Sequence, residues 1–219
     1  MNRNEPLRRR AWKNEPLVLF VEGYSDLTFY AQLMEHVGHF DRCFIQDLGG
    51  KGRAKLREEA TLLLKPDNLA RIESVGILLD ADENAAAAFS LASNALKDAV
   101  GVEIPRVGEW FAAGSAQTRY GVFIVGGEGG QIEVESLAWT AWSAKGANAK
   151  LATCVAEFVR CTEEADLKLK SIDKVRIGAA LAVMNEDDPR LGPAARAGIF
   201  DFNAPEFATL REFLRAIKA

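Results

Sequence analysis

The sequence predicts an α/β protein with a mostly parallel, four-stranded sheet flanked by helices and a helical extension at its C-terminal end. First, short apolar runs alternate with segments of helical periodicity, an order that gives βαβ crossovers and parallel pairing. Second, these runs are continuously apolar, as in Leu17–Val21, which is typical of strands buried on both faces. Third, the runs end in acidic residues, as expected where parallel strands stop at a binding edge.

The individual elements follow from hydrophobic spacing and from residues that stop helices. Apolar side chains at helical spacing predict a helix over residues 26–37, ended by Gly38. The alanine-rich stretch 85–100 is helical by intrinsic propensity. The strands are expected at 17–21, 43–46, 77–79 and 120–125, with a further short strand near 103–107. The other helices are expected at 54–64, through Trp139 and Trp142, at 149–162, at 172–184 and at the C-terminal end, with a loop at 185–204.

Length and composition suit one large domain, or one domain with an appendage. Of the 219 residues, 48% are hydrophobic, which is enough to bury a core. We expect residues 17–137 to form the α/β domain and residues 138–219 to form a helical extension packed on the same domain. No stretch approaches the ~18 consecutive apolar residues of a membrane span. The three cysteines lack metal-ligand spacing, so we expect them to be reduced and buried, in a cytoplasmic protein without a membrane partner.

The charge balance restricts the class of partner. The formal net charge of −4 argues against a dedicated nucleic-acid-binding domain, because such domains are usually basic. It does not exclude an enzyme that holds nucleic acid on a local basic track, or one whose acidic residues are masked by metal.

An acidic pair defines the candidate site. Asp80 and Asp82 follow the third apolar run, the first at the strand end and the second in the next loop. Two carboxylates this close repel each other unless a cation lies between them, and Mg²⁺ prefers hard oxygen ligands of this kind. The pair would also be favoured as a cap at the N-terminus of the following helix. Taken alone, it leaves both interpretations open.

Acidic residues after neighbouring strands favour the metal interpretation. Glu22 and Asp26 follow the first strand, and Glu133 and Glu135 follow a glycine-rich loop after the last strand. In a parallel sheet all of these carboxylates gather at one edge, where their repulsion is strongly destabilising without counter-ions. One or two divalent cations, Mg²⁺ or Mn²⁺, would resolve that repulsion. A two-metal arrangement suits in-line attack on a phosphodiester.

The motifs resemble the Toprim domain, the catalytic module of topoisomerases, primases, small ribosomal-RNA maturases and the overcoming-lysogenization-defect (OLD) nucleases. The resemblance lies in Val21-Glu22-Gly23-Tyr24-Ser25-Asp26 and in Leu79-Asp80-Ala81-Asp82, which match the family's glutamate–glycine and Asp-x-Asp marks in order and strand context. The likeness covers residues 17–137. It extends loosely to the end of the chain in small stand-alone Toprim-like proteins of unassigned function.

The resemblance implies a role for each matched acidic residue. It implies that Glu22 acts in acid–base chemistry or as a metal ligand, and that Asp80 and Asp82 hold Mg²⁺. Asp26, together with Glu133 or Glu135, resembles the additional acidic positions of the OLD branch, which complete a second metal position. There is no catalytic tyrosine context or zinc module, so the chain departs from the topoisomerase and primase branches.

Basic residues are the remaining candidates. In the nuclease branch a late lysine assists the chemistry, and Lys168, Lys170 and Lys174 are the candidates for it here. Lys174 is favoured because it stands at a helix start, although each of the three also fits a solvated helix face. Gly50 and Lys51 lie in a glycine-rich turn where flexible backbone and a cation suit phosphate binding. The same turn also fits a plain exposed connection.

Three functions stay open on this reasoning. The favoured one is a Mg²⁺-dependent nuclease or related phosphoryl-transfer enzyme acting on nucleic acid. Its ATPase partner would be a separate protein, since the OLD branch uses an ATPase and this chain lacks a Walker motif. The second is a haloacid-dehalogenase-like phosphatase with Asp80 as nucleophile beside Asp82. Against it, Asn84 stands where that motif usually has Thr or Val. The third is a non-catalytic Toprim-like binding or regulatory module.

Overall fold

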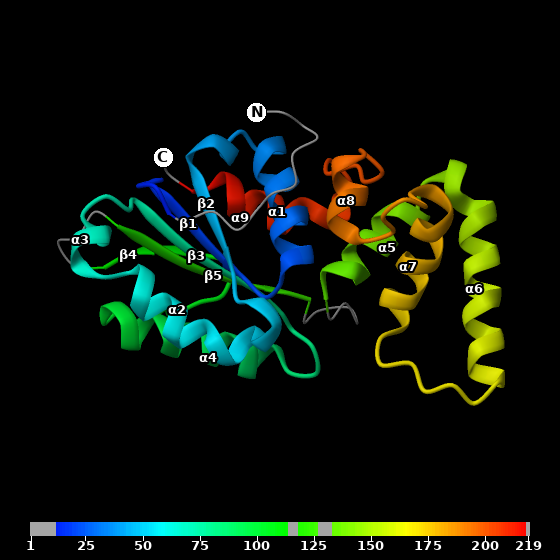
Figure 1. Cartoon of the computed structure of the whole chain (residues 1–219), viewed down its shortest axis with the longest axis horizontal. Helices are drawn as coiled ribbons and strands as arrows, with labels where there is room; N and C mark the ends of the chain where they lie inside the picture. Colours follow the sequence, from blue (N-terminus) through cyan, green and yellow to red (C-terminus); the bar gives the residue numbers. More distant parts are fainter. Residues whose placement is uncertain (1–11, 114–117, 127–132, 218–219) are drawn as a thin grey trace.

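The computed structural model describes residues 12–113, 118–126 and 133–217, and its centre is a five-stranded sheet in the order β2-β1-β3-β5-β4 (Figure 1). Strands β1 (Leu17–Val21), β2 (Cys43–Asp47), β3 (Ser74–Asp80) and β5 (Arg119–Val125) pair in parallel. The α/β class and the mostly parallel sheet expected from the sequence are therefore confirmed.

The fifth strand is not where the sequence pattern placed an extra strand. Residues 103–107 form no strand, and Pro105 among them has no N–H to donate to a ladder. Instead β4 (Trp110–Ala112) pairs antiparallel with β5 at the edge of the sheet. The parallel strands are the four expected ones, and β4 is an addition to them.

Helices cover both faces of the sheet because its strands are apolar on both sides. Leu17, Leu19 and Val21 of β1 join one buried cluster, and Val18 and Phe20 join the other. Helices α1 and α9 lie over the first face, and α2 and α4 lie over the second (Figure 1). These helices span α1 (Tyr24–His36), α2 (Leu56–Leu63), α4 (Ala85–Val100) and α9 (Ala208–Arg215).

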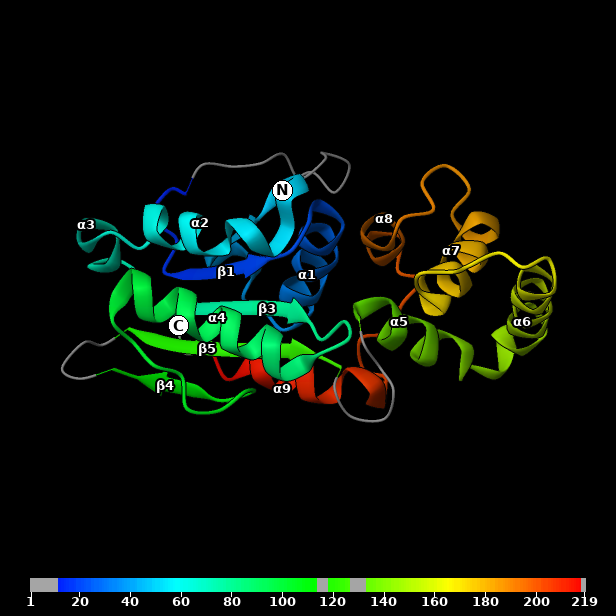
Figure 2. The same cartoon turned by 90° about the horizontal axis from the view of Figure 1, so that it is seen from below.

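The C-terminal helices lie mainly beyond the carboxyl ends of the strands, as Figures 1 and 2 show. They are α5 (Val134–Ser143), α6 (Ala149–Glu164), α7 (Ile172–Met184) and α8 (Leu191–Arg196). The expectation of an uninterrupted loop over 185–204 was wrong, because α8 lies within it. The boundary expected between residues 137 and 138 falls inside α5. Short turns of helix complete the chain: η1 (Phe40–Arg42), η2 (Gly49–Lys55), α3 (Pro66–Leu69), η3 (Gly146–Asn148) and η4 (Pro205–Phe207).

Helix α8 packs directly on α1 because one of its residues has no side chain. A Cβ at Gly192 would lie 1.5 Å from Thr28 Oγ1. The Thr28 hydroxyl donates a hydrogen bond to the Ser25 carbonyl oxygen, 2.8 Å away. The close approach therefore fixes the first turns of α1, the helix that carries Asp26.

The structure also tests the expectation that the three cysteines are reduced and buried. All three cysteines are free, and Cys43 is buried as expected, but Cys154 and Cys161 are exposed. The expectation of burial was wrong for these two because they lie on the outer side of α6.

Among the residues that the structure describes, no helix combines the length and the apolar character that crossing a membrane requires.

Candidate metal centre

The carboxyl ends of β1 and β3 bring the first two acidic motifs into direct contact. The parallel register sets Val21 beside Leu78, so that Glu22 reaches the last residue of β3. The Asp80 N–H donates a hydrogen bond to Glu22 Oε1 at 2.9 Å. Asp82 lies in the next turn with a positive φ of 45°. The neighbouring strand ends thus place Glu22, Asp80 and Asp82 at one edge of the sheet.

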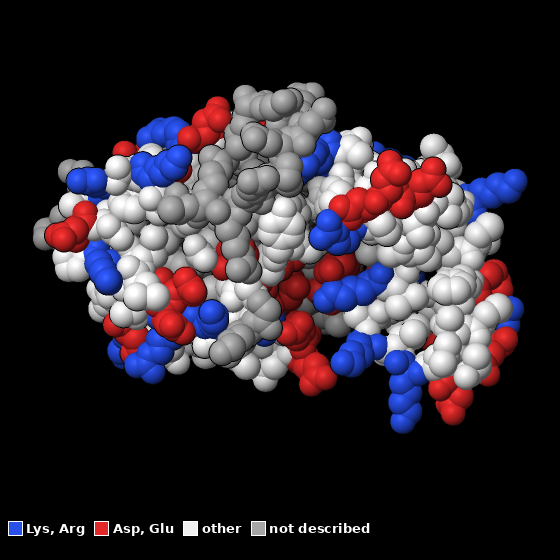
Figure 3. Space-filling view, in the orientation of Figure 1, with Lys and Arg blue, Asp and Glu red and all other residues white. Residues whose placement is uncertain are grey.

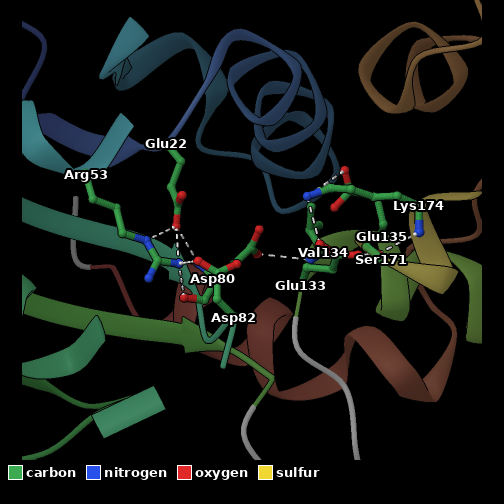
Figure 4. Close-up of polar contacts among 9 residues, drawn as sticks. All are labelled: Glu22, Arg53, Asp80, Asp82, Glu133, Val134, Glu135, Ser171 and Lys174. Carbon is green, nitrogen blue, oxygen red and sulfur yellow. Dashed lines mark hydrogen bonds and ion pairs between the residues drawn. The ribbon is translucent and has the colours of Figure 1, made fainter. Parts of the chain in front are cut away.

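An arginine binds the oxygens on this side of the site (Figure 4). Arg53 Nη2 lies 2.7 Å from Glu22 Oε1 and 2.9 Å from Asp82 Oδ2. The Arg53 Nε–H donates to the same Glu22 oxygen at 2.8 Å, and Nη2 also donates to the Asp80 carbonyl oxygen. Glu22, Arg53 and Asp82 are called the arginine arm. A planar guanidinium suits this role because its donors point in fixed directions.

A lysine and a serine bind the carboxylates on the other side of Asp80. Lys174 Nζ lies 2.8 Å from Glu133 Oε2 and 4.0 Å from Glu135 Oε1. Ser171 caps α7 by accepting the Lys174 N–H at 3.1 Å, and its hydroxyl donates to Glu133 Oε1. Glu133, Glu135, Ser171 and Lys174 are called the lysine arm. It comes from the start of α5 and the start of α7.

Asp80 joins the two arms. Its Oδ1 accepts a hydrogen bond from the Val134 N–H at 3.0 Å, which ties the end of β3 to the start of α5. One oxygen each from Asp80, Asp82 and Glu133 lie within 4.8 Å of one another. Three carboxylates from two segments, the end of β3 with its following turn and the start of α5, therefore form an acidic triad, with Glu133 nearly fully buried.

Burial raises the pKa values of three carboxyl groups at this edge. The pKa of Asp26 is raised to about 6 by burial, against the hydrogen bond from the Gly23 N–H. The pKa of Glu135 is raised to about 7 by burial, against the charge of Lys174. The pKa of Asp80 is raised well above its ordinary value by burial and by the charges of Asp26 and Glu135. Burial therefore favours the neutral form of these three carboxyl groups, and binding a cation would favour their charged form.

The residues fit a hard divalent cation. Every side chain of the triad offers carboxylate oxygen, the donor that Mg²⁺ and Mn²⁺ prefer. In addition, Glu135 Oε2 is buried and has no hydrogen-bond partner among the residues that the structure describes, which is costly for a charged group. Six carboxylates at this edge face two cationic side chains, Arg53 and Lys174, so a further cation would relieve their repulsion.

Comparison with known proteins assigns a family. Residues 16–218 match the family described as "Protein of unknown function (DUF3226)".

The chain belongs to this family.

A search among curated proteins found no match. A solved structure described as the C-terminal region of the Xanthomonas campestris pv. campestris OLD protein aligns with a TM-score of 0.41 and 17% identity. The alignment covers 92% of this chain and 94% of that chain. At these values the likeness establishes neither a shared fold nor a shared activity.

In this DUF3226 member the structure brings together most of the candidate residues. Asp26 is nearly buried at the start of α1, where its Oδ2 accepts the Gly23 N–H at 2.9 Å. Of the three candidate lysines only Lys174 contacts the acidic residues, while Lys168 and Lys170 are exposed and have no ion pair within the described chain. Gly50 and Lys51 lie in η2, but the side chain of Lys51 is outside the described part of the molecule.

Sequence reasoning missed two residues of the candidate metal centre, Arg53 and Ser171. Arg53 follows the Gly-Gly-Lys-Gly turn, and that turn had directed attention to Lys51 instead. Arg53 reaches the site because Gly52 adopts φ 50° and ψ −139°, which breaks the helical turn just before it. Ser171 carried a recognisable signal, since a serine directly before a helix is a favoured N-cap. Its second contact, to Glu133, depends on tertiary structure.

Proposed function

We propose that this chain is a cytoplasmic, Mg²⁺- or Mn²⁺-dependent nuclease, or a related phosphoryl-transfer enzyme, of Toprim type that acts on DNA or RNA. The observation that carries the proposal is the acidic triad of Asp80, Asp82 and Glu133, with Glu22 hydrogen-bonded to Asp80 from the neighbouring strand. A glutamate after β1 and an Asp-x-Asp after β3 are the Toprim marks, and they meet at the carboxyl edge of a parallel sheet.

The carboxylates divide into ligands for one or two cations. Asp80, Asp82 and Glu133 would hold the first, and Asp26 and Glu135 would complete a second position near Asp80. A bound divalent cation would supply charge stabilisation at a phosphoryl oxygen. On this proposal, the α/β part over residues 17–137 carries most ligands, and the helical part over 138–219 contributes Lys174 and Ser171.

The remaining side chains would position groups and move protons. Glu22 would act as general base or acid, and Arg53 would hold its carboxylate in place from two guanidinium nitrogens. Lys174 would hold the Glu133 carboxylate in position for the metal through their ion pair of 2.8 Å. Resemblance to the OLD branch supports a separate ATPase as partner.

A cleavage assay tests the proposal. Full-length protein is incubated with single-stranded and duplex DNA and RNA, with Mg²⁺ or Mn²⁺ or with a chelator. We expect metal-dependent cleavage by the wild type and none by Asp80→Asn, which keeps the Val134 hydrogen bond but removes the charge. Asp187→Asn, at an exposed position on the loop after α7, is the matched control and should cleave normally.

Two other outcomes would replace the proposal. Phosphate release from small phosphomonoesters with nucleic acid left intact would favour the haloacid-dehalogenase-like phosphatase. The bond from Val134 and the raised pKa of Asp80 speak against its use as the nucleophile that such a phosphatase needs. Metal binding without turnover of either substrate would favour a Toprim-like binding or regulatory module.

A further inference from the structure

Arg53 and the acidic triad share one carboxylate group. Asp82 belongs to the triad, with an oxygen within 4.8 Å of oxygens from Asp80 and Glu133. The same side chain binds Arg53 Nη2, which lies 2.9 Å from Asp82 Oδ2 (Figure 4). A divalent cation held by the triad would therefore meet a second positive charge at the Asp82 carboxylate, and two cations this close repel each other. Metal binding and the Arg53 contact thus compete for Asp82.

Asp82 is the member of the triad whose surroundings allow it to change partner. Its side chain is 56% exposed, whereas Glu133 is buried and Asp80 accepts the Val134 N–H at 3.0 Å. Asp82 also lies in the turn after β3, so no strand pairing fixes its backbone. An exchange of partners at Asp82 can therefore take place at the exposed edge of the site while the two more buried carboxylates keep their positions.

Arg53 has other contacts that would keep it at the site after it leaves Asp82. Its Nη2 atom carries two hydrogens but contacts three oxygens, on Glu22, on Asp82 and on the Asp80 carbonyl. If the Asp82 contact is lost, both hydrogens still have an acceptor, and the Nε–H still donates to Glu22 Oε1 at 2.8 Å. The chain is also anchored close by, because Leu56 at the start of α2 is fully buried. Arg53 is therefore a tethered cation for which the Asp82 contact is dispensable.

We propose that a divalent cation replaces Arg53 at Asp82, so that Arg53 is the counter-ion of the metal-free site and limits its affinity for metal. This inference rests on the metal centre of the proposed function, although not on the reaction carried out there. Because the metal must break the contact of 2.9 Å between Arg53 and Asp82, its net affinity is lower than the triad alone would give. A residue that only positioned the ligands would have the opposite effect, since its removal would weaken metal binding.

Titration calorimetry with Mn²⁺ alone, on the full chain and without nucleic acid, tests the exchange. We expect Arg53→Met to bind Mn²⁺ about tenfold more tightly than the wild type, an ordinary size for coupling between two ligands. Arg57→Met is the matched control, because Arg57 lies one turn along in α2 and pairs with Asp98 at the surface, and it should bind Mn²⁺ like the wild type. Arg53→Gln gives a second reading should the methionine variant fold poorly.

Thermal unfolding gives an independent measurement of the same exchange. The stability that Arg53→Met loses in chelator should shrink at saturating Mn²⁺, because the wild type then no longer has the Asp82 contact to lose. Unchanged or weaker Mn²⁺ binding by Arg53→Met, beside normal binding by the wild type, would overturn the exchange and leave the proposed function in place. Failure of every variant and of the wild type to bind Mn²⁺ would overturn the metal centre itself, and this inference with it.

Discussion

The two arms of the acidic centre solve the same electrostatic problem to different degrees. In the arginine arm one guanidinium contacts Glu22, Asp82 and the Asp80 carbonyl, so each acidic group has a donor. In the lysine arm one ammonium lies 2.8 Å from Glu133 but 4.0 Å from Glu135, and Glu135 Oε2 has no hydrogen-bond partner within the described residues. An added cation would therefore relieve most repulsion on the lysine side and at Asp80.

Figure 3 shows acidic and basic side chains meeting at the middle of the molecule, between the sheet and the C-terminal helices. In the arginine arm, Arg53 reaches this place from the turn after β2. The lysine arm reaches it from the starts of α5 and α7 (Figure 4). The two arms therefore bring side chains of the α/β part and of the C-terminal helices to one place, where the Val134 N–H also binds Asp80.

The largest effect is expected from Asp80→Asn, because Asp80 lies between the two arms and joins them. Removing its charge should weaken Mn²⁺ binding more than about a hundredfold, measured by calorimetry. In chelator the same variant should unfold at a higher temperature, with a gain of about 1–3 kcal/mol, because a crowded buried charge is lost. Equal stability and unchanged metal affinity would show that Asp80 is not a ligand. Asp187→Asn is again the control.

The next largest effect concerns the dependence of stability on pH through Glu135. Its folded pKa of about 7 lies above the ordinary value of 4.5, so its contribution to metal-free stability is fully present below 4.5 and is lost as the pH rises through about 7. Glu135→Gln should therefore match the wild type at low pH and exceed it by about 2–3 kcal/mol at high pH. Denaturant unfolding in chelator measures this difference. A difference that shrinks as the pH rises would contradict the assignment.

Breaking the arginine arm should destabilise the protein by about 1–2 kcal/mol. Arg53→Met leaves Glu22 and Asp82 without their shared donor while keeping much of the side-chain volume. Arg53→Lys should recover only part of the loss, since an ammonium cannot copy the two-nitrogen contact with Glu22. Thermal unfolding of the three proteins in chelator gives the comparison. Full recovery by lysine would mean that charge alone matters here.

The smallest effect is expected from Lys174→Met in the lysine arm. Its side chain is half exposed, so solvent screens the pair with Glu133, and the loss of stability should be about 0.5–1 kcal/mol. Lys168→Met, at an exposed lysine without an ion pair in the described chain, is the matched control. If both variants lose the same amount of stability, the ion pair between Lys174 and Glu133 does not stabilise the protein.

The fold class and the common edge at which the strands end were predictable, because they follow from the pattern of apolar residues along the sequence. Continuous apolar runs predicted β1 and β3, and parallel pairing then brought Glu22 and Asp80 to one edge. Arg53 was not predictable, because its reach depends on the backbone of Gly52. Helix α8 was missed because Gly192 and Pro193 are loop signals, yet proline is tolerated in a first helical turn and Gly192 is required for contact with Thr28.

The parallel order of the sheet also has a consequence for how the candidate metal centre is assembled. Each parallel pairing closes a long crossover, and the cluster is complete only when segments around residues 22, 80, 133 and 174 have met. Contacts so distant along the chain form slowly compared with helices. In refolding experiments the helical signal should thus return before Mn²⁺ binding does, which makes cation capture a marker of the last step of maturation.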